Sequence, residues 1–216
     1  MSKIDTIAVL TGDLIRSRAA GAKAVDATFA TLAAAATDFG AAWDLDLRFT
    51  RFRGDGWQMA LQDPGLTLDL ILFVLARLQA ADIGLRTRVA AGIGAIDSLG
   101  TRDLSDASGD AFNISGTALE EMSPKRTLLL AGAQVGSSEK AIIYLCDFIA
   151  AGWTRTQAEA VALAIHHRHP THDVIAGEIG VTRQAAQSRL SGAGFSALEE
   201  AMMAFRLHDF TSPTDS

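Results

Sequence analysis

The chain has 216 residues, of which 49% are hydrophobic, 20% charged and 6% aromatic, and only four are proline. This composition is typical of a globular protein of one or two domains and excludes a disordered, collagen-like or fibrous chain. The net charge of −6 excludes a generic polyanion-binding protein, so binding to DNA would require a local patch.

The single cysteine, Cys146, excludes an intramolecular disulfide framework and a multi-cysteine zinc site. Its apolar neighbours predict a buried thiol. No apolar run reaches the roughly 20 residues that a membrane helix needs, because Asp69 and Arg77 interrupt the longest one. Residues 1–5 lack the features of a signal peptide. We therefore expect a cytoplasmic protein with no membrane partner.

Strand-like and helix-like patterns alternate over residues 1–150. In chain order we expect a buried strand at 7–10 that stops at a loop, a helix at 20–40, strands at 45–53 and 57–61, a helix at 66–81, a strand at 86–96, a helix at 112–122 and a strand at 127–130. This order contains the β-α-β-β-α-β split unit of ferredoxin-like folds. Residues 53–56 form the hairpin turn, with Asp55 at its tip. We expect Trp57, in the returning strand, to belong to the core.

Residues 151–216 show only helical patterns, so the fold class is predicted as α+β. A ferredoxin-like domain over 1–150 is followed by an all-α domain over 151–216. In the second domain, Val174, Ile175 and Ile179 are expected on the inner face of a short helix. Gly180 can end that helix in the left-handed conformation, and Thr182 can cap the next one.

The second helix of this pair is expected to expose Arg183, Gln184, Gln187 and Arg189. Glutamine can pair with adenine and arginine with guanine, and residues near a helix N-terminus meet the base edges. The pattern resembles the helix-turn-helix of bacterial transcription factors, which makes Thr182 and the four exposed residues candidates for DNA binding. The alternative is a helical bundle used for dimerisation, which the acidic balance favours.

A histidine-rich segment precedes this pair, with His166, His167, His169 and His172. Metal binding is one reading, but Pro170 breaks the helix and no thiol or carboxylate has a clear place in the site. Solvated or phosphate-facing histidines are the favoured reading. They titrate near neutrality, so DNA affinity would depend on pH.

Two acidic residues stand out in the first domain. Asp13 follows the first strand and Asp55 lies in the hairpin, and the two strands are neighbours in a ferredoxin-like sheet. Facing carboxylates repel unless a cation lies between them, and Mg²⁺ or Mn²⁺ would suit this pair. Ordinary turn chemistry is the alternative for each aspartate.

Four segments in order resemble class III nucleotide cyclases: residues 8–15, 51–56, 88–94 and 106–113. The resemblance implies that Asp13 and Asp55 bind metal, that Asp106 reads the adenine amino group and that Asn113 orients the ribose. Arg51 stands where adenylate cyclases have a base-reading lysine.

The resemblance also implies that the segment with Arg16, Ser17 and Arg18 binds triphosphate. The transition-state arginine of cyclases corresponds to Thr117, and no basic residue occurs in residues 113–122. Loss of such a donor can cost roughly 10²–10³ in rate. Lys125 or Arg126 could substitute for it.

The whole chain resembles the SatD family of bacterial proteins through its Thr-Gly-Asp strand, Arg-Gly-Asp-Gly hairpin, Gly-Asp-Ala-Phe-Asn-Ile-Ser-Gly helix start and helix-turn-helix tail. Three functions remain open. The first is a dimeric transcription regulator whose cyclase-like domain binds a nucleotide with a divalent metal. The second is an active purine nucleotide cyclase or nucleotidyl transferase with two-metal catalysis. The third is a non-catalytic dimeric scaffold.

Overall fold

The computed structural model describes residues 6–52, 54–101, 103–168 and 170–212. Arg53 of the predicted hairpin turn, His169 of the histidine-rich segment and residues 1–5 lie outside the described residues. The described strands are β1 (Thr6–Ile15), β2 (Arg48–Arg51), β3 (Gly56–Leu61), β4 (Arg86–Ala95) and β5 (Leu128–Ala131). The described helices are α1 (Ser17–Ala20), α2 (Ala22–Trp43), α3 (Thr67–Ala81), α4 (Asp110–Glu120), α5 (Ser137–Ala151), α6 (Arg155–His166), α7 (His172–Ile179), α8 (Arg183–Gly192) and α9 (Phe195–Leu207), with short 3₁₀ turns at η1 (Pro64–Leu66) and η2 (Leu104–Asp106).

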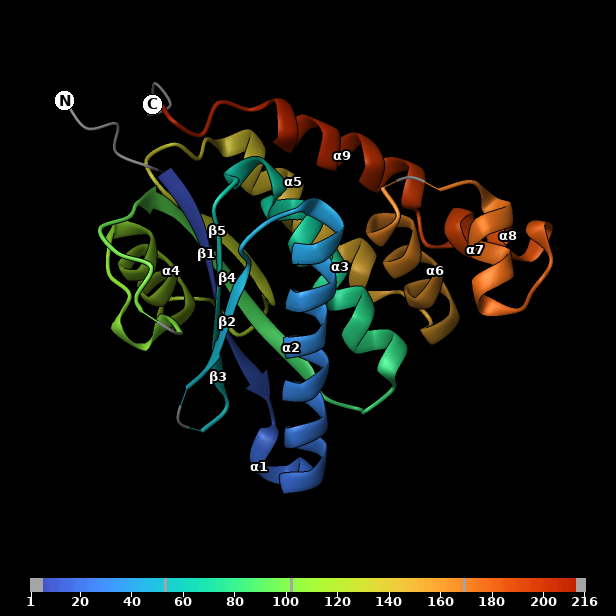
Figure 1. Ribbon diagram of the computed structural model, residues 1–216, viewed down its shortest axis with the longest axis horizontal. Helices are drawn as coiled ribbons and strands as arrows, with labels where there is room; N and C mark the ends of the chain where they lie inside the picture. Colours follow the sequence, from blue (N-terminus) through green and yellow to red (C-terminus); the bar gives the residue numbers. More distant parts are fainter. Residues whose placement is uncertain (1–5, 53, 102, 169, 213–216) are drawn as a thin grey trace.

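The described strands form one mixed sheet in the order β2-β3-β1-β4-β5. Neighbouring strands are antiparallel except β4 and β5, which are parallel. Helix α4 covers one face, and α2 and α3 cover the other (Figure 1). The α+β architecture with an all-helical C-terminal region is therefore confirmed.

Strand β1 is longer than the sequence predicts. It was expected to stop after residue 10, but it continues to Ile15 because β3 and β4 pair with it on both sides. Thr11, Gly12 and Asp13 therefore lie within a central strand, and the expectation that they form a loop is wrong. Gly12 leaves room for the Trp57 indole, since a Cβ there would lie 2.4 Å from the ring.

Helix α5 has no counterpart among the predicted elements, although the sequence has an apolar run around Cys146. It begins after β5, and its Ile143, Cys146 and Ala150 are buried against the sheet layer. The thiol of Cys146 is buried as expected, and Trp57 is fully buried in the core.

The helical region packs directly on the sheet domain. Helix α6 lies along α3, and one hydrophobic cluster includes residues from β1 through to Phe210. Asp69 of α3 is fully buried and forms an ion pair with Arg206 of α9. Figure 1 shows α9 lying across the α5 and α3 side of the molecule toward the α7–α8 pair. The segments before and after residue 150 thus share one core.

One described segment, Pro64–Ala81, is long and apolar enough by composition to cross a membrane. However, 61% of it is buried inside the protein, as in the core helix of a globular fold.

Candidate functional site

Asp13, Asp55 and Arg88 lie together at one end of the three neighbouring strands β3, β1 and β4. Asp13 lies opposite Gly56 of β3 on one side and opposite Arg88 of β4 on the other. Asp55 immediately precedes β3, and its carbonyl oxygen accepts a hydrogen bond from the Leu14 N–H at 3.1 Å. The expectation that the first strand and the hairpin carry the two aspartates to one place agrees with this register.

Arg88 is the residue that the sequence reading missed here. Its guanidinium binds both carboxylate oxygens of Asp13, with Nε 2.9 Å from Oδ1. The hydrogen bonding to Asp13 is the main cause that raises the pKa of Arg88; burial opposes it, and the negative charges of Asp13 and Asp55 add to it. The period-2 alternation of β4 would have placed Arg88 on the same face as Asp13 once the strand pairing was known.

The side chain of Asp55 is bound by the start of α1. Its Oδ2 accepts a hydrogen bond from the Ser17 hydroxyl at 2.6 Å, which links the hairpin to the start of α1. The carboxylates of Asp13 and Asp55 are hard oxygen ligands of the type that Mg²⁺ and Mn²⁺ accept. Within the described residues no group of three or more His, Cys, Asp or Glu side chains could hold a metal. To bind a metal ion, Asp13 would have to release Arg88, and water or substrate would have to supply the remaining ligands.

A hollow of about 370 Å³ opens next to Asp55, lined by Ser17, Arg18, Gly21, Ala22, Val25, Asp26, Arg51, Gly54 and Asp55. Helix α2 begins at its edge, and Gly21 provides no side-chain cap for the first N–H groups of the helix. Arg51 reaches across the hollow to Asp26 at 2.9 Å and lies over the Phe29 ring. A free helix N-terminus beside arginines is a favourable place for an anion.

Of the predicted triphosphate-binding residues, Ser17 and Arg18 line this hollow and Arg16 does not. Arg16 is exposed and connects β1 to α1 in a left-handed conformation, with φ of 59°. That conformation turns the chain at the end of the strand, which brings Ser17 toward Asp55.

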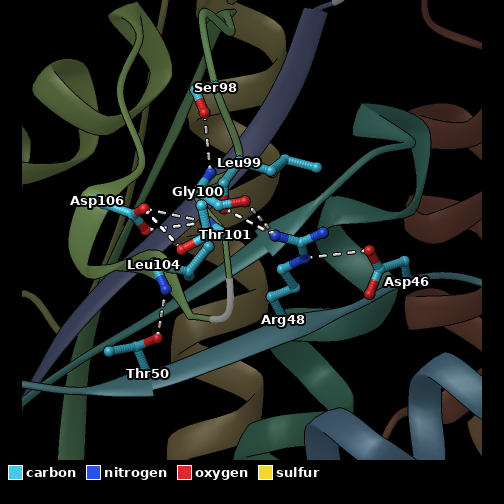
Figure 2. Close-up of polar contacts among 9 residues, drawn as sticks. All are labelled: Asp46, Arg48, Thr50, Ser98, Leu99, Gly100, Thr101, Leu104 and Asp106. Atoms are coloured by element: carbon cyan, nitrogen blue, oxygen red, sulfur yellow. Dashed lines mark hydrogen bonds and ion pairs between the residues drawn. The ribbon is translucent and has the colours of Figure 1, made fainter.

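Asp106, expected to read a base, holds a loop together (Figure 2). Its carboxylate accepts hydrogen bonds from the Thr101 N–H at 3.1 and 3.2 Å and from the Thr101 hydroxyl at 3.0 Å. Arg48 of β2 fixes the same loop by donating to the carbonyl oxygens of Leu99 and Gly100, both at 3.0 Å. The carboxylate oxygens of Asp106 are therefore already used within the loop.

Asn113 and Thr117 are exposed on α4. Neither they nor Asp106 line the hollow that contains Ser17, Arg18 and Arg51. Helix α4 lies very close to β4, because a Cβ at Gly92 would come within 2.6 Å of α4 backbone atoms. The structure thus groups Asp55, Ser17, Arg18 and Arg51 around one hollow and leaves the base candidate Asp106 and the ribose candidate Asn113 outside it.

The α7–α8 pair has the local geometry that the sequence predicts. Gly180 ends α7 in the left-handed conformation, with φ of 66°. The Thr182 side chain caps α8 by accepting from the Ala185 N–H at 3.2 Å. Arg183, Gln184 and Gln187 are exposed on the first turns of α8. Three of the four predicted side chains therefore form one solvent-facing surface.

Two expectations for this pair are wrong. Arg189 is not exposed like the others: its side chain is 22% exposed and donates to Glu159 of α6 at 3.0 Å, because α8 turns this side toward α6. Val174 is 45% exposed, and the inner face of α7 is formed by Ile175, Ala176 and Ile179 instead.

Two of the described histidines contact other side chains of the fold. His166 stacks on Phe73 with ring centroids 6.2 Å apart, so it is not the solvated side chain that was expected. His167 binds Glu178 of α7 at 2.5 Å. Within the described part of the chain these histidines join no cluster suited to a metal.

Comparison with known proteins adds no identification. No known protein family matches the chain, and no curated protein matches it. The resemblances to nucleotide cyclases and to the SatD family therefore depend on the motifs quoted above.

Proposed function

We propose that this protein is a DNA-binding regulator that responds to a phosphorylated ligand of the nucleotide class. The observation that carries the proposal is the α7–α8 pair, with Gly180 at the turn, Thr182 as the cap, and Arg183, Gln184 and Gln187 exposed together. These side chains can bind base edges and phosphates from the start of a helix. In this proposal α7 and α8 are a helix-turn-helix, and α8 is its recognition helix.

The sheet domain is proposed to be ferredoxin-like and to hold the ligand. The order β2-β3-β1-β4 with antiparallel neighbours supports this, because it is the order of the split β-α-β-β-α-β unit. The ligand's phosphates would bind at Ser17, Arg18 and the start of α2. Asp13 and Asp55 would hold Mg²⁺ or Mn²⁺, which supplies positive charge to the phosphates when bound. Arg88, released from Asp13, would remain beside the anion.

The shared core limits how ligand binding can affect DNA binding. The α6–α3 packing and the Asp69–Arg206 ion pair tie the helical region to the sheet layer. The ligand would therefore change DNA affinity by favouring one arrangement of two protomers over another, which requires unequal affinity for the two arrangements.

DNA binding is tested by selection from a pool of random double-stranded DNA, followed by anisotropy titrations of the enriched sequence. We expect Gln184→Ala and Gln187→Ala to reduce affinity for that sequence without lowering thermal stability. Gln62→Ala, an exposed glutamine near the sheet, is the matched control. The absence of any enriched sequence would contradict the proposal, as would wild-type affinity in both α8 variants.

Ligand binding is tested by thermal shift with ATP and GTP, each with and without Mg²⁺. We expect stabilisation that is lost in Arg18→Ala. It should persist in Lys23→Ala, because Lys23 is exposed on the first turn of α2 but does not line the hollow. Equal shifts in the two variants would refute the assignment of the hollow. If a nucleotide stabilises the protein but leaves its DNA affinity unchanged, the proposal that the ligand regulates DNA binding is refuted.

The second candidate is a purine nucleotide cyclase or related nucleotidyl transferase. The convergence of Asp13, Asp55 and Arg88 favours it, and the position of Thr117 on α4 opposes it. Incubation with ATP or GTP and Mn²⁺, with products resolved by mass, tests it. A cyclic product lost in Asp13→Ala would establish the enzyme, and unchanged triphosphate would remove this candidate.

A further inference from the structure

The outer face of α5 carries large apolar side chains that the described residues leave exposed. Tyr144, Leu145 and Phe148 are 51%, 61% and 80% exposed, although all three belong to a helix whose opposite face is buried. Their spacing of one, three and four residues places them on the same side of the helix, together with Ala141. We call these four residues the α5 face.

The α5 face has no charged side chain. From residue 141 to residue 152 the exposed positions are Ala141, Tyr144, Leu145, Phe148, Ala151 and Gly152. Two cations border this surface: Arg126 lies over the Tyr144 ring at 4.5 Å, and Lys140 is exposed one turn before Tyr144. Because the four residues of the α5 face carry no charge, a surface that matches them would also be apolar at its centre.

A hollow of about 580 Å³ adjoins Phe148, where the end of α5 meets the turn from α8 to α9. Gly152, Gly192 and Gly194 contribute to its lining, and the absence of side chains at these positions helps to leave it open. A projecting phenyl ring and a recess of adequate size therefore lie side by side on one surface. In a two-fold symmetric dimer the same patch serves both partners, so a knob next to a hole is self-complementary.

We propose that a second copy of this chain covers the α5 face, with Phe148 of each copy seated in the glycine-lined hollow of the other. Aromatic side chains carry about 150–250 Å² each, so Tyr144 and Phe148 at their observed exposure present roughly 200–330 Å². A standard interface takes about 800 Å² per partner, so these two rings would supply roughly a quarter to two fifths of it.

The position of α8 relative to this surface fits the proposed DNA binding, on which this step depends. The end of α8 lines the hollow at Ser191 and Gly192, so two such ends would meet near the symmetry axis. Helix α8 has 10 residues and is about 15 Å long, and its exposed Gln184 lies at the far end. If the two helices run in opposite directions away from the axis, their N-terminal ends lie about 30 Å apart, close to the roughly 34 Å between half-sites on DNA.

Multi-angle light scattering coupled to gel filtration tests the dimer without nucleotide or DNA. The purified full-length chain is compared with Phe148→Glu and with Met203→Glu, a control whose side chain is 49% exposed on α9, one turn before the Arg206 that faces α3. We expect a dimer for wild type and for Met203→Glu, and a monomer with unchanged circular dichroism for Phe148→Glu. Leu145→Glu is the second variant and is expected to behave like Phe148→Glu.

A wild-type protein that is monomeric over the micromolar range would overturn the proposal. So would dimers that survive both Phe148→Glu and Leu145→Glu, because the interface would then lie elsewhere. A monomer that still binds its selected DNA sequence at wild-type affinity would separate the two ideas: the α5 interface would stand, and its role in spacing two α8 helices would fall.

Discussion

The ion pair between Asp69 and Arg206 gives the sharpest prediction for stability. The Asp69 side chain is fully buried in α3, and the Arg206 guanidinium that binds it comes from α9, 137 residues later in the chain. Replacing Arg206 by Met keeps a long side chain but leaves a carboxylate in the core without this cation. Removal of one partner of a buried pair costs about 3–5 kcal/mol, so we expect a loss of that size in Arg206→Met.

The assay is urea denaturation followed by tryptophan fluorescence and circular dichroism. Trp43 is a suitable reporter because Arg206 lies 5.0 Å from the centre of its ring. For a chain of this length, 1 kcal/mol corresponds to about 2–4 °C in Tm, so Arg206→Met is expected to melt roughly 6–20 °C below wild type. Adding Asp69→Asn to Arg206→Met removes the buried charge and should recover a large part of the loss.

The matched control is Arg77→Met. Arg77 also binds a carboxylate across two helices, at 2.5 Å from Asp38, but the two side chains are 31% and 40% exposed. Pairs of this kind contribute at most about 1 kcal/mol. If Arg206→Met costs no more than Arg77→Met, or if Asp69→Asn brings no recovery, the reasoning from burial is refuted.

Three further predictions concern packing, thiol reactivity and pH. Gly92→Ala places a Cβ against the backbone of α4 and should lower the free energy of unfolding by about 1–3 kcal/mol. Gly116→Ala has open space around it and should raise the free energy of unfolding by about 0.5–1 kcal/mol. The denaturation midpoints of the two variants test both expectations. Burial raises the pKa of Cys146 to about 12, so a thiol reagent at pH 8 should react about 10²–10³-fold more slowly with the native protein than in urea. Burial opposes the ionisation of Glu139. Hydrogen bonds from backbone N–H groups and the Ser138 hydroxyl, together with the nearby His208, nevertheless hold its pKa below the ordinary value of 4.5. The wild type should therefore be more stable than Glu139→Gln above about pH 4.5, and this difference should disappear as the pH falls through the lowered pKa; an advantage that persists in acid would contradict it.

Local patterns were sufficient for much of the fold. The helix at 66–81 and the strand at 86–96 were predicted within one residue of their ends, because a continuous apolar pattern and a glycine-containing strand are strong local signals. Gly180 and Thr182 were predicted as the turn and the cap of the α7–α8 pair because helix ends are set by residues next to them in sequence. Strand β1 was predicted too short, since its last five residues are extended through pairing with strands that are distant in sequence.

The candidate site shows the same division. The sequence indicated Asp13 and Asp55 from two short motifs, and it placed Arg16, Ser17 and Arg18 near a helix start. It did not reveal Arg88 as the partner of Asp13. That pairing depends on β1 and β4 lying side by side, and their residues are 75 positions apart.

The sequence by itself determined the type of each element that it predicted, the turn chemistry at Gly180 and the residues that can carry charge, because these follow from side-chain chemistry within a few positions. Tertiary structure decided which of those residues meet. It paired Arg189 with Glu159 instead of leaving it in solvent, and it used Asp106 to close its own loop. It also left the α5 face uncovered, which no local pattern could reveal because exposure depends on what the rest of the chain packs against.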